Sequence, residues 1–241
     1  MKLSIIIPTL NEEKVLENLL IQLTDKKLKD KFDFEIIVSD GGSKDDTLKI
    51  AKKYTDKIIL CNSVQNQNIA IGRNIGASIA KGELLCFINA DIKLPNPEEL
   101  FDDLIHCFEK DYVAYTCSVK IDPDQEILSD KIFLNFYNYY FHFLNIINVG
   151  MGRGECQVIK KSIFDETHGY NENLAAGEDF ELFKRIRKIG KIYFSHRVKV
   201  FESPRRYRKY GHILIFLSWL LNSIFVIFKK KSYSKKWEEV R

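Results

Sequence analysis

Three polar turns in the first hundred residues carry side chains that could do chemistry. They are PTLNEE at residues 8–13, SDGGS at residues 39–43 and NAD at residues 89–91. Carboxylate oxygens bind hard divalent cations, and a carboxylate can also accept a proton as a general base. Asp91 is the one acid of the third turn, and Asn89 adds an amide carbonyl two residues earlier. These residue types predict a polar site, provided that the fold brings the turns together.

The elements around these turns indicate how they are positioned. Each turn follows an apolar segment of strand length, at residues 3–7, 34–38 and 84–88, with a further such segment at 57–60. Segments with helical periodicity lie between them, and residues 96–108 begin with an N-cap asparagine and Pro97. This alternation predicts a parallel sheet with helices on both faces. Ligands bind beyond the carboxyl ends of such strands, so the three turns are expected to meet there.

The second half of the chain is less regular. Strands are expected at residues 113–121, 156–159 and 191–201, and a helix at 179–189. Residues 132–149 are unusually aromatic, and the glycine-rich residues 150–154 predict a flexible loop.

The composition of the chain limits the class of protein to which it can belong. A chain of 241 residues with 45% apolar and 29% charged residues is a folded protein, long enough for one large α/β domain or two small ones. The first residues do not resemble a secretory signal, and the five cysteines form no C-x-x-C pair, which favours a reduced, cytoplasmic compartment over a zinc or disulfide framework. Residues 203–241 hold ten Lys or Arg against two Glu, whereas the remainder is mildly acidic. This asymmetry predicts that the tail contacts an anionic surface, and that the protein has no nucleic-acid partner.

The tail contains an apolar segment at residues 212–228, shorter than the roughly 20 residues that span a bilayer. Basic clusters flank it on both sides, at residues 205–209 and 229–231. This pattern favours a helix at the cytoplasmic, inner face of a membrane, held by anionic lipids. A spanning helix and a buried or oligomer-forming helix remain alternatives.

Four blocks together resemble family 2 of the inverting glycosyltransferases. They are SIIIPTLNEE, EIIVSDGGSKDDT, GRNIGASIAKGELLCFINADIKLP and GYNENLAAGEDFELFKRI, in the order and spacing of that family, and the resemblance covers roughly residues 2–199. The resemblance implies the GT-A fold, a Rossmann-like three-layer α/β sandwich with a mostly parallel sheet, here followed by the C-terminal apolar helix. It implies a transferase domain at residues 1–202, with a nucleotide-sugar half (1–95) and an acceptor half (96–202), and a tail at 203–241.

The resemblance also implies a role for each site residue. Asp179 would be the general base, with Glu178 beside it in support, and Asp91 would bind Mn²⁺ or Mg²⁺ at the end of a D-x-D-like motif in which Asn89 brings no charge. The residues expected to contact the nucleotide sugar are Pro8, Thr9, Glu12, Asp40, Arg73, Asn89 and Ala90.

These features predict a metal-dependent, non-processive, inverting transfer from a nucleotide sugar to an acceptor hydroxyl on a lipid-linked or cell-surface glycan. Alternatives are a polyprenyl-phosphate sugar synthase, a non-catalytic nucleotide-sugar-binding protein and a nucleotidyltransferase. Several residues also have structural interpretations: Asp40 as a turn residue, Arg73 as a solvated helix residue, and Asp179 as a helix N-terminal acid. Whether Arg153 holds a phosphate, and whether His168 or His196 completes the metal site, stays open.

Overall fold

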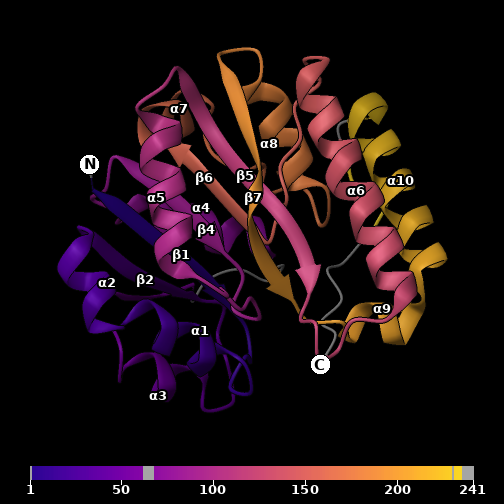
Figure 1. Ribbon diagram of the computed structural model, residues 1–241. Coiled ribbons are helices and arrows are strands. Elements are labelled where there is room, and N and C mark those ends of the chain that lie inside the picture. Colours follow the sequence, from indigo (N-terminus) through magenta and orange to yellow (C-terminus); the bar gives the residue numbers. More distant parts are fainter. Residues whose placement is uncertain (1, 62–67, 230, 235–241) are drawn as a thin grey trace.

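The computed structural model describes residues 2–61, 68–229 and 231–234. The tail expected at 203–241 therefore falls partly outside the described residues. The helices are α1 (Leu16–Leu23), α2 (Lys26–Lys31), α3 (Thr47–Ala51), α4 (Ile69–Ser78), α5 (Pro97–Phe108), α6 (Leu128–Ile146), α7 (Lys161–Glu166), α8 (Glu178–Ile186), α9 (Arg205–Tyr210) and α10 (His212–Lys229). The strands are β1 (Leu3–Thr9), β2 (Phe34–Asp40), β3 (Ile58–Leu60), β4 (Leu84–Ile88), β5 (Tyr112–Ile121), β6 (Cys156–Lys160) and β7 (Lys191–Glu202). Figure 1 shows their arrangement.

One mixed sheet of seven strands runs through the described chain in the order β3-β2-β1-β4-β6-β5-β7. Strands β1, β2, β3 and β4 are parallel, and β5 is parallel to β7. Only β6 is antiparallel to its neighbours, β4 and β5. The expected mostly parallel α/β sheet is confirmed, and β6 joins the regular first half to the second.

Strand β1 shows why both faces of the sheet need helices. Ile5 and Ile7 belong to one core cluster with the buried leucines of α1 and α5, whereas Ile6 belongs to a second cluster with residues of α4 and α8. Successive strand side chains point to opposite faces, so an apolar run must be covered twice. Gly76 allows α4 to lie close, because a Cβ there would come within 2.5 Å of Ile6 Cγ2. The three-layer arrangement is confirmed.

The loop expected to be flexible at residues 150–154 is instead packed. Gly150, Met151, Gly152 and Arg153 are buried. The Asn145 side chain accepts a hydrogen bond from the Met151 amide (2.7 Å) and donates one to the Met151 carbonyl (2.8 Å). A Cβ on Gly150 would lie 2.5 Å from the Phe183 carbonyl oxygen, so glycine serves close packing here.

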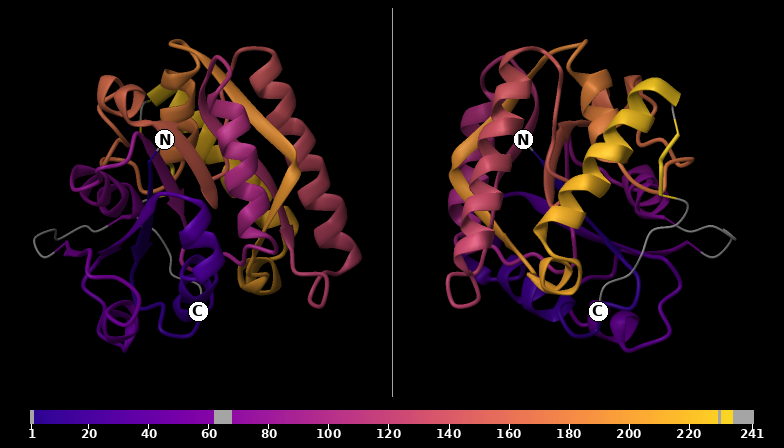
Figure 2. Two further views of the ribbon diagram at one scale, coloured as in Figure 1. Left: turned by 60° about the vertical axis from the view of Figure 1, so that its left-hand side comes forward. Right: turned by 90° about the vertical axis from the view of Figure 1, so that its right-hand side faces the viewer.

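The apolar tail segment forms helix α10, which packs against α6 and α8. Figure 2 (right) shows α6 and α10 on the same side of the molecule. The aromatic rings of Tyr137 and Trp219 meet at 5.1 Å between the two helices. Among the described residues, none of the helices has both the length and the apolar character needed to cross a membrane.

The basic cluster at residues 205–209 is partly paired within the protein, and its contact with lipid stays a prediction. Arg208 donates to both carboxylate oxygens of the fully buried Asp130, at 2.8 and 2.5 Å, and His212 pairs with the same carboxylate at 2.8 Å. Burial alone would raise the pKa of Asp130, but the hydrogen bonds from Arg208 lower it to about 2. This ionic contact ties the start of α10 to the first turn of α6.

Candidate active site

A cavity of about 730 Å³ lies beyond the carboxyl ends of β1, β2 and β4 and extends between α6 and α10. Nine of the ten sequence-predicted site residues line it: Pro8, Thr9, Glu12, Arg73, Asn89, Ala90, Asp91, Glu178 and Asp179. They come from four separate segments, namely the end of β1 with the turn after it, the turn after β4, helix α4 and the first turn of α8. The convergence that the turns predicted is confirmed.

Asp40, the tenth predicted residue, does not line the cavity. Its side chain is fully buried and accepts hydrogen bonds from Thr9 Oγ1 (2.9 Å), Ser43 Oγ (2.6 Å) and the amides of Gly42 and Ser43. Its neighbours Ser39 and Gly41 do line the cavity. The carboxylate therefore holds the turn after β2 in shape, and direct contact with a nucleotide stays a prediction.

The turn after β4 presents Asp91 between two anchored neighbours. Ala90 and Ile92 are buried, and the Ile92 amide donates to the Asn89 carbonyl at 3.2 Å. Asp91 Oδ2 accepts a hydrogen bond from Arg205 Nη2 at 3.2 Å, and the same nitrogen lies 3.9 Å from Glu12 Oε2. A guanidinium thus occupies the space between two carboxylates of different turns.

This arrangement fits a divalent cation. Hard cations take carboxylate oxygens as ligands, and Mg²⁺ in particular accepts one or two of them from protein with the rest from phosphate and water. Asp91 and Glu12 supply such oxygens, and Arg205 shows that a positive charge is stable between them. No group of three or more His, Cys, Asp or Glu side chains suited to a metal occurs among the described residues. The remaining ligands would therefore come from the donor and from water.

Arg73 links the two ends of the site. It is 1% exposed, and its guanidinium donates to Glu178 Oε1 (2.9 Å), Asn89 Oδ1 (3.1 Å) and the Gly154 carbonyl (2.7 Å). The interpretation of Arg73 as a solvated helix residue is wrong. Because Asn89 accepts from Arg73, its amide oxygen is directed to α4, and Arg73 joins the β4 turn to the start of α8.

Asp179 is the second carboxylate with a distinctive environment. Gly177, with φ at +83°, precedes α8, whose first turn holds Glu178, Asp179 and Glu181. Desolvation in the cavity wall and the neighbouring charge of Glu178 raise the pKa of Asp179 to about 7. A Cβ on Gly154 would stand 3.1 Å from Asp179 Oδ2, so the glycine leaves room beside this oxygen. A carboxyl group with a pKa near neutrality is suited to general base chemistry.

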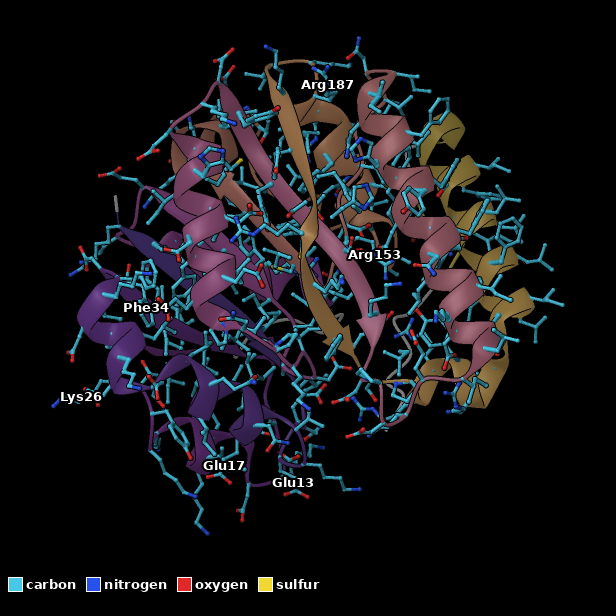
Figure 3. The ribbon with its side chains drawn as sticks, viewed as in Figure 1. Glu13, Glu17, Lys26, Phe34, Arg153 and Arg187 are labelled. Atoms are coloured by element: carbon cyan, nitrogen blue, oxygen red, sulfur yellow. The ribbon has the colours of Figure 1, made fainter. Side chains whose placement is uncertain are left out.

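Arg153, considered above as a residue that could hold a phosphate, instead pairs with two acids that the sequence did not point to. Arg153 is 2% exposed and pairs with Glu155 (3.1 Å) and Glu202 (3.4 Å), and Tyr207 donates to Glu202 at 2.6 Å. Arg153 lies in the interior, between the sheet and helix α6 (Figure 3). Burial and the charge of Glu155 raise the pKa of Glu202 to about 8. Glu155 and Glu202 stand in no recognisable motif, so only the folded structure shows that both lie next to Arg153.

The far wall of the cavity is apolar and aromatic. It is formed by side chains of α6 and α10, among them Tyr137, Phe141, Phe216, Trp219 and Leu220. Tyr137 is in edge contact with Phe141 (5.3 Å) and Trp219 (5.1 Å). The sequence showed that residues 132–149 are unusually aromatic and that residues 212–228 are apolar, but not that the two segments would close one cavity.

The two candidate histidines are not in the site. His196 pairs with His142 at 3.0 Å, on the α6 side of β7, and His168 lies in the turn after α7 with φ at +57°. Neither lines the cavity.

The comparisons with known proteins identify the family and the fold of the chain. The sequence profile of glycosyl transferase family 2 matches residues 4–167. A dolichyl-phosphate β-glucosyltransferase from Mus musculus is 31% identical over 159 residues, which cover 59% of this chain and 48% of the mouse protein. The chain therefore spans about half the length of this curated relative.

Two solved structures resemble the whole fold. TarS of S. aureus, residues 1–349, matches with a TM-score of 0.63 and 20% identity, over 95% of this chain and 73% of that one. The mannosyltransferase PcManGT of Pyrobaculum calidifontis, solved with GDP-Man and Mn²⁺, matches with a TM-score of 0.63 and 18% identity, over 89% of this chain and 64% of that one. At such identities the likeness shows the fold, and the expected GT-A fold is confirmed.

Proposed function

The chain belongs to glycosyl transferase family 2, and on that premise we propose that it moves a sugar from a nucleoside-diphosphate donor to an acceptor hydroxyl with inversion at the anomeric carbon. The observation that carries this proposal is that Asp91 and Asp179 line one cavity. They reach it from different segments, the end of β4 and the start of α8. Asp91 can help to stabilise the leaving diphosphate, and Asp179 can take the proton from the attacking hydroxyl.

The donor side is the set of turns at the carboxyl ends of β1, β2 and β4, within residues 1–95. Pro8, Thr9 and Glu12 line the cavity there beside Asn89, Ala90 and Asp91, and Arg73 faces them from α4. We assign the nucleotide to this side, and Asp40 supports it by shaping the β2 turn. Residues 96–202 and the tail supply the other wall, which we assign to the acceptor.

We further propose that Asp91, with Glu12 as the second carboxylate, holds Mn²⁺ or Mg²⁺ together with the donor's diphosphate. The bound ion supplies charge stabilisation for the diphosphate leaving group. Asp91 stands on a rigid strand end between buried neighbours, so it can keep an ion at a fixed place. Arg205 must move away from Asp91 for this to happen, since its guanidinium occupies the same space.

Asp179 is proposed to take the proton from the acceptor hydroxyl. Its raised pKa, about 7, leaves it partly ionised at neutral pH and makes it a stronger base than an ordinary carboxylate. Glu178 is committed to Arg73 at 2.9 Å, so it acts on Asp179 through its charge and does not receive the proton. A base that faces the sugar opposite the departing diphosphate leads to inversion in one displacement.

A hydroxyl acceptor is favoured over an anionic one by the carboxyl group of Asp179. Its pKa, raised to about 7, suits it to take a proton from a hydroxyl, and an acceptor that is already an anion does not need this step. A polyprenyl-phosphate acceptor is the second candidate, because the mouse relative carries dolichyl phosphate in its name and the acceptor wall is apolar.

The test is a panel of nucleotide sugars with Mn²⁺, scored by thermal shift and then by product mass in the presence of candidate acceptors. At least one donor is expected to stabilise the wild type, and Asp91→Ala is expected to lose that shift. If none of the nucleotide sugars stabilises the wild type, the proposal is wrong. A product formed with a polyprenyl phosphate and retained in Asp179→Asn would select the second candidate, since that acceptor needs no base.

A further inference from the structure

Helix α6 exposes a long apolar stripe. Its exposed side chains recur at spacings of three and four residues and include Leu128 (72% exposed), Ile132, Phe136, Tyr139, Tyr140, Phe143 and Ile146. This spacing puts them on one face of the helix. The opposite face, with Leu134, Tyr137 and Phe141, is buried against the rest of the protein. Helix α6 is therefore apolar on two sides, and only one of them is covered.

Helix α10 repeats the pattern. Its exposed apolar side chains are Ile213 (76% exposed), Leu214, Leu217, Leu220, Leu221 and Ile224, again spaced by three and four residues. Its inward face, with Ile215 and Val226, is buried in the clusters shared with α6 and α8. We call the two exposed stripes together the α6–α10 face, and Figure 2 (right) shows both helices on one side of the molecule.

The α6–α10 face is continuous with the cavity. Phe136 and Tyr140 of α6, and Leu220 and Ile224 of α10, line the cavity while remaining 40–55% exposed. The cavity therefore opens between the two helices, and its opening has an apolar rim on both sides. A surface that covered this face would also cover the opening.

The charges around the face favour an anionic partner. Residues 131–153 contain no Asp or Glu, and neither do residues 203–237. Asp130, at the start of α6, is buried and paired with Arg208. Lys131 and Lys209 are exposed at the ends of α6 and α9. Helices that lie in a lipid interface have this composition. They carry an apolar face, tyrosines within that face and lysines at its edge.

We propose that the α6–α10 face rests on an anionic lipid bilayer, and that the acceptor is a lipid-anchored molecule that reaches Asp179 from the membrane through the opening between α6 and α10. The second clause rests on the proposed function. A second copy of the chain is a less suitable occupant, because a protein packed over this face would close the opening. A bilayer covers the same apolar area and supplies the acceptor.

The test is co-flotation of the full chain with vesicles of phosphatidylcholine, with and without phosphatidylglycerol. The wild type is expected to float with the anionic vesicles and to be partly released by salt, which screens the basic contribution. A double substitution Phe143→Ser with Leu214→Ser changes two exposed residues of the face that do not line the cavity. It is expected to lower vesicle affinity by about tenfold or more, because both side chains lose their burial in lipid.

The matched control is Ile21→Ser with Ile105→Ser. These isoleucines are exposed on α1 and α5, at 54% and 38%, and should leave flotation unchanged. Donor-induced thermal shift in every variant reports folding and the donor site independently of lipid. A donor shift without flotation would overturn the membrane proposal and leave the proposed function in place. Flotation without a donor shift for any nucleotide would overturn the proposed function, and with it the acceptor clause, and would leave the membrane contact in place.

A second copy is tested by light scattering after size exclusion. A wild-type dimer that Phe143→Ser with Leu214→Ser converts to a monomer, combined with no flotation, would assign the face to self-association and overturn the proposal. Equal flotation of the double variant and its control would overturn it as well.

Discussion

The two walls of the cavity are built in different ways. The donor wall consists of turns at strand ends, and each polar side chain there has a named partner, such as Asp40 with Thr9 and Arg73 with Asn89. The acceptor wall consists of two long helices with aromatic contacts and few hydrogen bonds, as between Tyr137 and Trp219. Fixed charges on one side suit a polar group that must be held in a single position. An apolar wall without directional bonds suits a larger molecule that enters and leaves.

The largest effect is expected from Asp179→Asn, which removes the base and keeps the shape of the donor wall. We expect turnover with a hydroxyl acceptor to fall about 10³-fold, within the usual range for loss of general base catalysis. Donor binding by thermal shift should persist. Glu166→Gln, on the exposed side of α7, is the control. Loss of donor binding together with activity would mean that Asp179 belongs to the donor wall.

Asp91→Ala should act on the donor wall alone. We expect Mn²⁺-dependent nucleotide affinity to fall about 10²-fold, because removal of an ion-holding carboxylate weakens the ion and the diphosphate together. Isothermal titration with nucleotide, with and without Mn²⁺, measures it, and exposed Asp56→Ala is the control. An unchanged affinity in Mn²⁺ would separate Asp91 from the metal.

The pH dependence of activity and of stability tests whether the environment in the cavity raises the pKa of Asp179. Below the raised pKa of Asp179, about 7, the reactive carboxylate should fall tenfold for each pH unit, and kcat/KM with it. Between its ordinary value of 3.8 and about 7, the folded state binds more protons than the unfolded chain. The free energy of unfolding should therefore decrease as pH rises through that window.

Asp179→Asn should remove this part of the pH dependence of unfolding and stabilise the protein at pH above about 7, since no charge then forms in the desolvated cavity wall beside Glu178. Urea titrations across the pH range measure it. A wild-type pH–rate profile with an inflection near 4 would show that burial does not tune Asp179.

Trp219→Ala should affect the acceptor wall. Trp219 is half-buried and contacts Tyr137, so we expect the KM for the acceptor to rise about tenfold, with about 2 kcal/mol lost from the free energy of unfolding. Donor affinity should stay the same. The control is Tyr233→Ala, an exposed aromatic that does not line the cavity. A donor defect in Trp219→Ala would contradict the separation of the two walls.

Arg205→Gln should have the smallest effect, and it sharpens the metal assignment. The ion pair between Arg205 and Asp91 is partly solvated, with the side chains 28% and 30% exposed, so it contributes about 1 kcal/mol or less. Without that competing cation, Mn²⁺ affinity in the absence of nucleotide should rise up to about fivefold by electron paramagnetic resonance. Weaker Mn²⁺ binding would mean that Arg205 supports the ion site.

Much of the fold could be predicted because its signals are local. Apolar runs such as residues 84–88 became strand β4 with the same bounds, and the Asn96 side chain caps α5 by accepting from the Glu99 amide at 3.2 Å. Asp91 and Asp179 could be proposed as site residues because each follows a motif at a predictable strand or helix end, and both line the cavity. Strand runs, helix caps and motifs extend over only a few residues, so they can be read directly from the sequence.

The sequence by itself thus determined the alternating elements, the polar turns at one edge of the sheet and the apolar character of α6 and α10. Only the tertiary structure decided which charges meet: Arg205 reaches Asp91 across 114 residues, and Arg73 reaches Glu178 across 105. It also decided that Asp40 is buried in its turn and that Asp179 titrates near neutrality. The physical reason is that burial and electrostatic contact depend on distance in space, which no local pattern specifies.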